Sequence, residues 1–295
     1  MSFVGHVRRT MCLCVLSAAI VSCADVQPSQ SPTLPNGGTP TWTLVWRDEF
    51  DGPAGTLPDS LKWSHDTADG CPVGICGFSN RDKQYYTRAP DNASLNGFGQ
   101  LAIVARRASP GLLCSDGPCR YTSAKMTTRG KMGALPGRVE ARIKIPSGQG
   151  LWPAFKILGT SFPATPWPQC GELDIMENRG SDPRTVSSAM HGPGYFNVAF
   201  LGHAYTLHNG GTLADDYHDY VVEWNSERVS FYVDATLHFS FNRAEVERFG
   251  PWPFDQSFFI VLNLAVGGVY DGDPQSDVIF PATMLTDYVR VYVRS

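Results

Sequence analysis

The sequence lacks the features that identify several large classes of protein. Basic residues are not in excess, because 24 Lys and Arg stand against 28 Asp and Glu and give a formal net charge of -4. Nothing electrostatic therefore points to a nucleic-acid partner. The apolar run from Met11 to Val21 is too short to span a bilayer comfortably. No internal repeat is visible, and the histidines do not have the spacing of a zinc site.

The first 24 residues differ from the rest of the chain. Arg8 and Arg9 precede the apolar run and small residues follow it, which is the pattern of a secretory signal peptide over residues 1–24. The stretch Ile20-Val21-Ser22-Cys23 also looks like a bacterial lipobox, in which Cys23 would become the lipidated first residue. Simple cleavage near Ala24 is the alternative, and both remain open. We expect an exported protein, secreted or attached to the cell envelope as a lipoprotein.

Residues 25–41 are rich in Pro, Ser, Gly and Thr and nearly free of large apolar groups, which is typical of a tether. The remaining chain, residues 42–295, has a size that a single all-β domain reaches. We therefore expect one folded domain behind a signal peptide and a tether.

Cysteine usage supports export. Cys71 and Cys76 form one close pair and Cys114 and Cys119 another, each around a Gly/Pro turn, so two local disulfides are expected in an oxidising compartment. A zinc site made by these four residues is the less favoured alternative, because the turns do not suggest a zinc knuckle. Cys170 is left over, and we expect it to be a buried thiol.

Many short segments have the composition of strands. Arg138–Ile145 alternates polar and apolar residues, and Gly and Pro clusters separate it from similar segments. Helical periodicity is weak and predicts one short helix, Asn242–Phe249. Short strands with turn signals between them indicate an all-β sandwich of antiparallel sheets. The other predicted strands are Leu101–Arg106, Tyr220–Trp224, Val229–Val233, Phe258–Leu264 and Asp287–Val293.

The segment GELDIMEN, residues 171–178, carries three carboxylates among apolar residues. On a strand, residues i and i+2 share a face, so Glu172 and Asp174 point one way while the apolar residues between them point into the core. The same alternation would bury Glu177 without a partner, which is very unfavourable. A β-bulge near Met176 would return Glu177 to the face of the other two acids.

Three acids on one face are able to perform glycosidase chemistry. Retaining glycosidases need two carboxyls about 5–5.5 Å apart, one as nucleophile and one as acid/base. Asp174 would hold Glu172 in place, and Glu177 would be the protonated partner, with its pKa raised by the nearby negative charge. Taken alone, the pattern is also compatible with the solvated face of an edge strand or with a calcium site.

The surrounding blocks make the chain resemble glycoside hydrolase family 16 over essentially residues 42–295. GELDIMEN is similar to the bulged form of that family's active-site strand, and further blocks match in the family's order. These blocks are WRDEFDG (46–52), NRDKQYYT (80–87), GRVEARIKIPSGQGLWPAF (137–155), HGPGY (191–195), YHDYVVEW (217–224), LNLAVGG (262–268) and DYVRVY (287–292).

The resemblance implies a jelly-roll sandwich of two curved antiparallel sheets with a concave substrate cleft. It implies endo-hydrolysis of a β-linked polysaccharide with retention, because the bulged motif is similar to that of laminarinase-like endo-β-1,3-glucanases. It assigns Glu172 as nucleophile, Glu177 as acid/base and Asp174 as an assisting carboxylate, with no cofactor for catalysis. We expect a monomer. The alternatives are a β-galactan hydrolase or a transglycosylase of the same family, and a non-catalytic glycan-binding protein on the same fold.

The resemblance also implies which residues line the cleft. Trp152 and Trp167 match positions at which rings stack on sugars. Asn80 and His191 match polar positions, and Asn263 lies in the block LNLAVGG. We expect these five side chains, together with Lys156, to contact substrate.

Three residues depart from the family's pattern. Lys156 stands where laminarinase-like members usually have Trp, and by alternation it shares a face with Trp152 and Ala154. It is either an ion-pair partner that lowers the pKa values of the acids or part of a subsite suited to an anionic or otherwise different sugar. Lys125 stands where many relatives have Arg, and Tyr270 where Trp is frequent.

A structural calcium ion is a further implication of the resemblance. The matching positions are Glu49, the carbonyl of Gly99, and Asp287, and oxygen ligands suit calcium. The two carboxylates are equally compatible with surface charges.

Overall fold

The computed structural model describes residues 41–114, 117–196, 201–208, 210–278 and 280–295. The predicted signal peptide, the lipobox at Cys23 and the tether up to residue 40 lie outside these residues, and the compact unit that begins at Pro40 contains the folded domain. Within the described ranges, no helix is long and apolar enough to cross a membrane.

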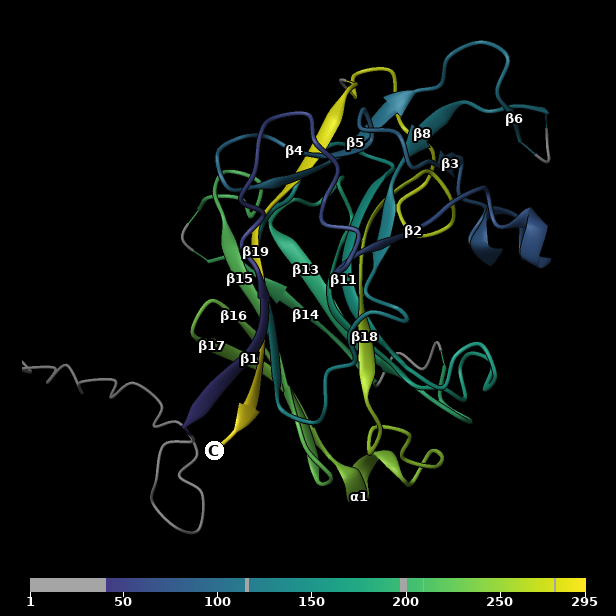
Figure 1. The fold of residues 1–295 in the computed structure, drawn as a ribbon. Coiled ribbons are helices and arrows are strands. Elements are labelled where there is room, and N and C mark those ends of the chain that lie inside the picture. The colour runs from purple at the N-terminus through teal and green to yellow at the C-terminus, as the bar shows by residue number, and fades with distance from the viewer. Residues whose placement is uncertain (1–40, 115–116, 197–200, 209, 279) are drawn as a thin grey trace, which may run out of the picture. The chain divides into compact units, whose positions relative to one another are not determined.

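Two β-sheets make up most of the domain (Figure 1). The larger, here called sheet A, has ten strands: in order β17 (Thr236–Asn242), β16 (Arg228–Val233), β15 (His218–Trp224), β10 (Arg138–Lys144), β19 (Ala282–Arg294), β5 (Leu101–Arg107), β8 (Tyr121–Ser123) and β3 (Gln84–Tyr86), with β1 (Trp42–Asp48) paired to β19 and β4 (Ala93–Leu95) paired to β5.

The second sheet, here called sheet B, has seven strands: in order β14 (Gly202–Thr206), β13 (Thr185–His191), β12 (Glu172–Asn178), β11 (Leu151–Gly159), β18 (Phe258–Val266), β9 (Lys125–Thr127) and β2 (Ser64–Asp66). The minor elements are the hairpin of β6 (Leu113–Cys114) and β7 (Gly117–Pro118), the short 3₁₀ turns η1 (Cys71–Val73) and η2 (Cys76–Ser79), and α1 (Arg243–Val246).

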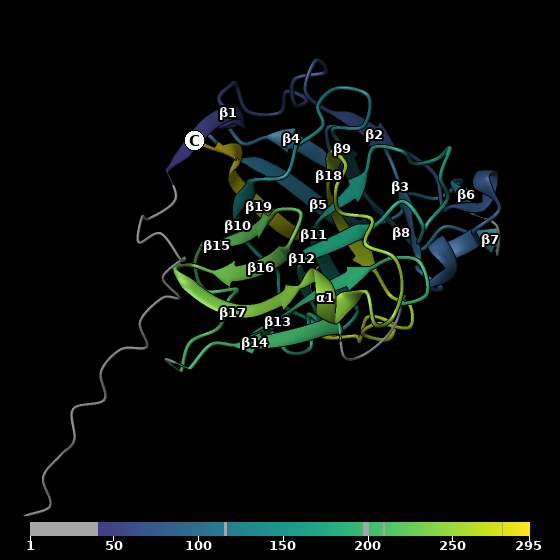
Figure 2. The ribbon, with the colours of Figure 1, turned by 90° about the horizontal axis from the view of Figure 1, so that it is seen from below.

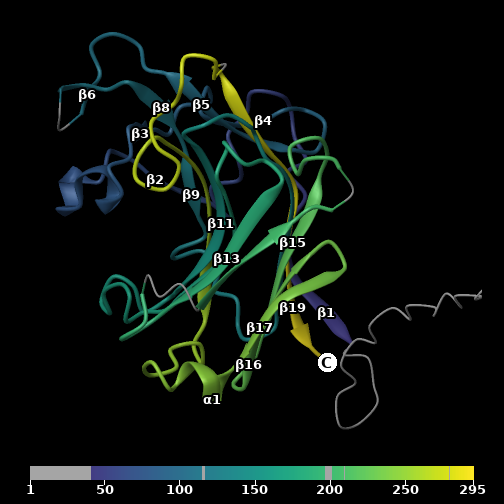
Figure 3. The same cartoon turned by 180° about the vertical axis from the view of Figure 1, so that it is seen from behind.

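Sheets A and B pack face to face, as expected of a jelly-roll sandwich. Figure 2 shows β10, β15, β16 and β17 in one layer and β11, β12, β13 and β14 in the other. Figure 3 shows β11 and β13 from the opposite side to Figure 1. All strand pairs are antiparallel except β3 with β8. The predicted all-β fold is therefore confirmed.

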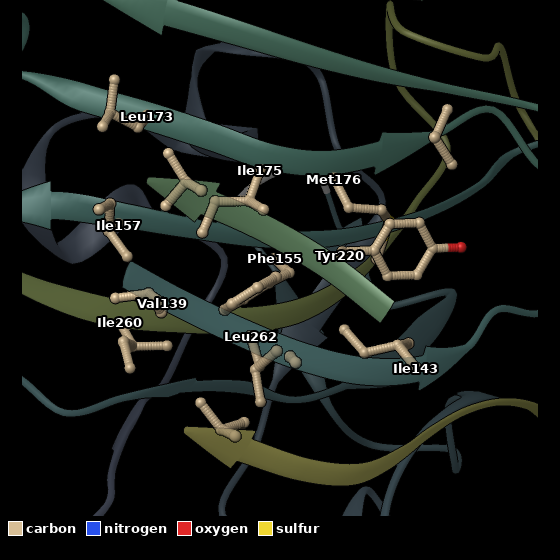
Figure 4. Close-up of a cluster of buried hydrophobic side chains, with 14 of the residues drawn as sticks. Val139, Ile143, Phe155, Ile157, Leu173, Ile175, Met176, Tyr220, Ile260 and Leu262 are labelled. Carbon is tan, nitrogen blue, oxygen red and sulfur yellow. The ribbon is translucent and has the colours of Figure 1, made fainter. Parts of the chain in front are cut away.

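The layer between the sheets is a continuous apolar core (Figure 4). Strand β12 contributes Leu173, Ile175 and Met176, each at most 1% exposed. These side chains face apolar residues of β11, β18 and sheet A, because each strand turns its alternate residues inward. The labelled neighbours in Figure 4 are Phe155, Ile157, Ile260, Leu262, Val139, Ile143 and Tyr220.

The predicted strands all occur, some with extended ends, and β19 begins at Ala282 rather than at Asp287. The predicted helix is shorter than expected, spanning Arg243–Val246 only. Its start is well specified, because Asn242 and Glu245 form a capping box. Gly250 and Pro251 follow closely and do not favour a longer helix.

The cysteine predictions are confirmed. Cys71 pairs with Cys76, and Cys114 pairs with Cys119. Cys170 is a free and buried thiol.

Candidate active site

The bulge predicted in β12 is present. Toward β11, Met176 pairs with Phe155 and Asp174 pairs with Lys156, so Ile175 is the extra residue in that ladder. The register toward β13 is also interrupted, between Asp174 and Glu177. Ile175 and Met176 both enter the core, and Glu177 returns to the outer face of sheet B.

The entry into β12 is fixed by a glycine. Gly171 has a φ of 77°, a left-handed conformation that favours glycine. A Cβ at this position would lie 2.9 Å from Pro253, so a side chain would also collide with the neighbouring loop. The turn therefore delivers Glu172 directly from the loop that carries Trp167, and the indole N–H of Trp167 donates a hydrogen bond to the Glu172 carboxylate.

Lys156 contacts all three acids. Its Nζ lies 2.9 Å from Glu172 Oε1, 3.1 Å from Asp174 Oδ1 and 3.7 Å from Glu177 Oε1. The lysine side chain is only 18% exposed, so these ion pairs are largely shielded from solvent. Of the two alternatives for this residue, the observed contacts are those of an ion-pair partner.

His191 completes the charge cluster from β13. Its Nε2 lies 2.8 Å from Asp174 Oδ2. Burial opposes the charged imidazole, but the hydrogen bond and the charge of Asp174 outweigh it and raise the pKa of His191 to about 9. Burial likewise opposes ionisation of Asp174, yet Lys156 and His191 hold the pKa of Asp174 well below its usual range. At neutral pH, Asp174 is therefore an anion between two cations.

Glu177 has the opposite protonation preference. Burial, followed by the charge of Asp174, raises the pKa of Glu177 to about 7, although Lys156 opposes this increase. The indole N–H of Trp152 donates to Glu177 Oε1 over 3.0 Å. Trp152 also stacks on Tyr270, with ring centroids 4.4 Å apart. A buried carboxyl that keeps its proton near neutral pH is suited to act as an acid.

The cleft continues from the acids across sheet B. Ala154 of β11 pairs with Asn263 of β18, which pairs in turn with Lys125 of β9. The lining of the cleft includes Asn80, Trp152, Lys156 and Asn263 from the predicted substrate-binding set. Trp167 and His191 lie beyond Glu172, with ring centroids 5.9 Å apart. The predicted residues are thus brought to one face, and their contacts with sugar stay a prediction.

Sequence reasoning did not assign three polar or aromatic residues that also line the cleft: Phe78, Asp82 and Tyr86. Burial raises the pKa of Asp82 to about 6, and the ring of Phe78 lies beneath the Lys125 ammonium, 5.3 Å from it. Asp82 lies within the block NRDKQYYT, two residues after Asn80, so that block was an available signal. No comparable signal marked Phe78.

The residues predicted to hold calcium are not arranged as free ligands. Both carboxylate oxygens of Glu49 accept hydrogen bonds from Arg290, at 2.9 Å each. Asp287 lies 3.7 Å from Arg142. Among the described residues, no group of three His, Cys, Asp or Glu side chains could hold a metal ion. The two carboxylates do not fit a calcium site in this arrangement, because each is already paired with an arginine.

Comparison with known proteins agrees with this geometry. The family model described as "Glycosyl hydrolases family 16" matches residues 81–289. The chain belongs to this family. It is therefore a glycoside hydrolase, and as a family 16 enzyme it needs no catalytic cofactor.

Relatives of this family 16 chain match it over most of its length. A protein named "Beta-glucanase" from Rhodothermus marinus is 36% identical over 293 residues, covering 94% of this chain and 92% of the relative. "Glucan endo-1,3-beta-glucosidase A1" from Niallia circulans is also 36% identical and covers 86% of this chain, but only 39% of that longer protein.

Solved structures extend the similarity to the fold. The catalytic domain of an endo-1,3-beta-glucanase (laminarinase) from Thermotoga petrophila has a TM-score of 0.81 and 40% sequence identity. The match covers 87% of this chain and all of that domain. The family 16 fold predicted from the motifs is thus confirmed.

Proposed function

We propose that this protein is a retaining endo-β-1,3-glucanase that cleaves internal linkages of laminarin-like β-glucans. The names of the relatives, a β-glucanase and a glucan endo-1,3-beta-glucosidase, support the substrate class. The intact set of three acids favours an enzyme over a non-catalytic glycan-binding protein.

The observation that carries the mechanism is that Glu172 and Glu177 both face one ammonium group. Their Oε1 atoms lie 2.9 Å and 3.7 Å from Lys156 Nζ. Because both distances start from the same nitrogen atom, the two oxygens cannot be farther apart than the two distances added together. This limit favours the carboxyl spacing of retaining enzymes, about 5–5.5 Å, over that of inverting enzymes, about 6.5–9.5 Å.

In the first step, protonated Glu177 donates its proton to the glycosidic oxygen while ionised Glu172 attacks the anomeric carbon. The bond between that carbon and the glycosidic oxygen breaks, and a glycosyl ester with Glu172 forms. In the second step, ionised Glu177 takes a proton from water as the water oxygen attacks the anomeric carbon. Glu172 leaves as a carboxylate. Asp174 stays ionised throughout and orients Lys156 and His191.

The test is release of reducing sugar by the purified protein from laminarin, with mixed-linkage glucan, agarose and carrageenan alongside. Glu172→Gln is the matched variant, because it keeps the shape of the side chain and removes the nucleophile. Laminarin hydrolysis that this variant loses is expected. Activity only on a galactan would replace the substrate assignment, and products longer than the substrate would indicate transglycosylation.

A second measurement tests retention. Proton NMR of the first product from laminarin is expected to detect the β-anomer before mutarotation. If the α-anomer appears first, the double-displacement mechanism is wrong even though the substrate is right.

Two further properties belong to this proposal. Export, with lipid attachment at Cys23, is supported by the signal-like sequence of residues 1–24. It is tested by mass spectrometry of the mature N-terminus and by Cys23→Ser. A structural calcium ion near Glu49, Gly99 and Asp287 rests on the family resemblance alone, and binding it would require both carboxylates to leave their arginine partners. It would require a rise in Tm on adding Ca²⁺ that EDTA reverses.

A further inference from the structure

One charged side chain at the centre of the cleft has no part in the reaction described above. Lys156 lies in the middle of β11, directly opposite Asp174 of β12. Its ammonium is within 4 Å of three carboxylates. It donates no proton to the sugar in the proposed steps and attacks no atom. A lysine so placed must nevertheless alter the energies of the charged forms around it.

We propose that Lys156 is a positioning residue that holds the three carboxylates in one arrangement and determines which of them carries the proton when the reaction begins. The proposal rests on the proposed function. It follows from the unequal distances, because the ammonium is closest to Glu172 and farthest from Glu177. The charged form is therefore favoured most at the nucleophile and least at the acid.

The other neighbours do not replace this cation. Protonated His191 contacts Oδ2 of Asp174, whereas Lys156 contacts Oδ1. Lys125, on β9, pairs with Asp66 of β2 at 3.6 Å. Asp82 and Tyr86 also line the cleft; they are titratable groups that feel the charge of Lys156, and they make no ion pair with it. Lys156 is thus the one described cation in ion-pair contact with both catalytic glutamates.

The sign of the effect follows from the charges. A cation favours the ionised form of a neighbouring carboxyl, and its removal favours the protonated form. Replacing Lys156 by a neutral residue removes the ammonium contact of both catalytic glutamates, and the basic limb of the pH–rate profile reports the effect on Glu177. The replacement raises the pKa of Glu177 above about 7, which moves the basic limb to higher pH.

The experiment is the pH dependence of kcat/KM on laminarin for the wild type, Lys156→Met and Lys156→Arg. In Lys156→Met the basic limb is expected to move up by about 1–2 pH units. Lys156→Arg is expected to keep the profile close to that of the wild type, because it retains the charge. Lys144→Met is the matched control: Lys144 lies on β10 of sheet A and donates to the carbonyl of Asp215.

Carboxyl-carbon NMR titration of the same proteins separates this proposal from the proposed function. If the wild type hydrolyses no glycan, the glucanase assignment fails, while an upward shift of the Glu177 titration in Lys156→Met still supports the role of Lys156. If Lys156→Met does not fold, Lys156→Gln replaces it. A basic limb and a Glu177 titration that stay unmoved in a folded neutral variant would overturn the proposal. A loss of activity in Lys156→Met that is confined to a sulfated galactan would also overturn the proposal, because Lys156 would then belong to a substrate subsite.

Discussion

Asp174→Asn is expected to move the basic limb of the pH–rate profile in the direction opposite to Lys156→Met. After burial, the negative charge of Asp174 is the largest cause of the raised pKa of Glu177. The amide keeps the size of the side chain and removes the charge. Glu177 then lies near Lys156 and His191 without the anion that partly neutralised them, so its protonated form loses stability.

The magnitude follows from the shift that one neighbouring charge produces, about 1–2 pKa units. Starting from a pKa of about 7, Glu177 would titrate at about 5–6. At pH 7 the protonated fraction of the acid then falls from about one half to between about 1% and 10%. We therefore expect kcat/KM at pH 7 to fall by about 5- to 50-fold from this cause alone, with much of the loss recovered near pH 5.

The assay is kcat/KM for laminarin from pH 4 to pH 9, because that parameter reports groups of the free enzyme. Histidine NMR of the same variant is expected to show the pKa of His191 falling from about 9 toward its usual range. Asp219→Asn, at an aspartate of sheet A that pairs with Arg142, is the control. A uniform loss of rate with an unmoved basic limb would refute the reasoning, because Asp174 would then act without controlling the proton on Glu177.

Three further predictions concern the surroundings of the acids and the stability of the sandwich. Trp167→Phe removes the indole hydrogen bond to Glu172. A hydrogen bond to a charged group contributes about 1.5–3 kcal/mol, so kcat/KM should fall by about 10- to 150-fold. Tyr270→Ala removes the ring stacked on Trp152 and should raise KM by about two- to tenfold with little change in kcat, because such stacking contributes about 0.5–1.5 kcal/mol. Arg138→Met leaves two paired glutamates of sheet A without their cation. Urea titration should measure a loss of about 2–3 kcal/mol in the free energy of unfolding, with kcat unchanged. This loss is below the range for a fully buried pair, because the arginine is partly exposed.

The bulge in β12 was predictable because one strong penalty dominates. A straight strand would place Glu177 in the apolar core, and no other residue of the segment could compensate for that cost. The observed burial of both Ile175 and Met176 agrees with the prediction. Local alternation was likewise sufficient to place Lys156 on the same face as Trp152, because that inference needs one strand only.

The partners of Lys156 were harder to predict, because they depend on register between strands. Lys156 pairs with Asp174 only because the extra residue of β12 interrupts the ladder between Phe155 and Lys156. The position of a bulge along a strand is set by packing on both faces, which a single sequence does not specify. The loop that carries Phe78 was also inaccessible to pattern reasoning. Phe78, Ser79 and Arg81 all have positive φ, and neither the helical nor the strand period describes such a chain path.

The charge balance of the cleft explains why Glu177, rather than another acid, retains a proton. Three carboxylates face two cations, Lys156 and His191, so one carboxyl remains uncompensated when all three are ionised. Asp174 contacts both cations, and Glu172 has the closest contact with the ammonium together with the indole donor. Glu177 has only the longest of the three ion pairs and a neutral indole N–H. The proton therefore resides where its removal is least compensated, at the carboxyl that the proposed reaction requires to be an acid.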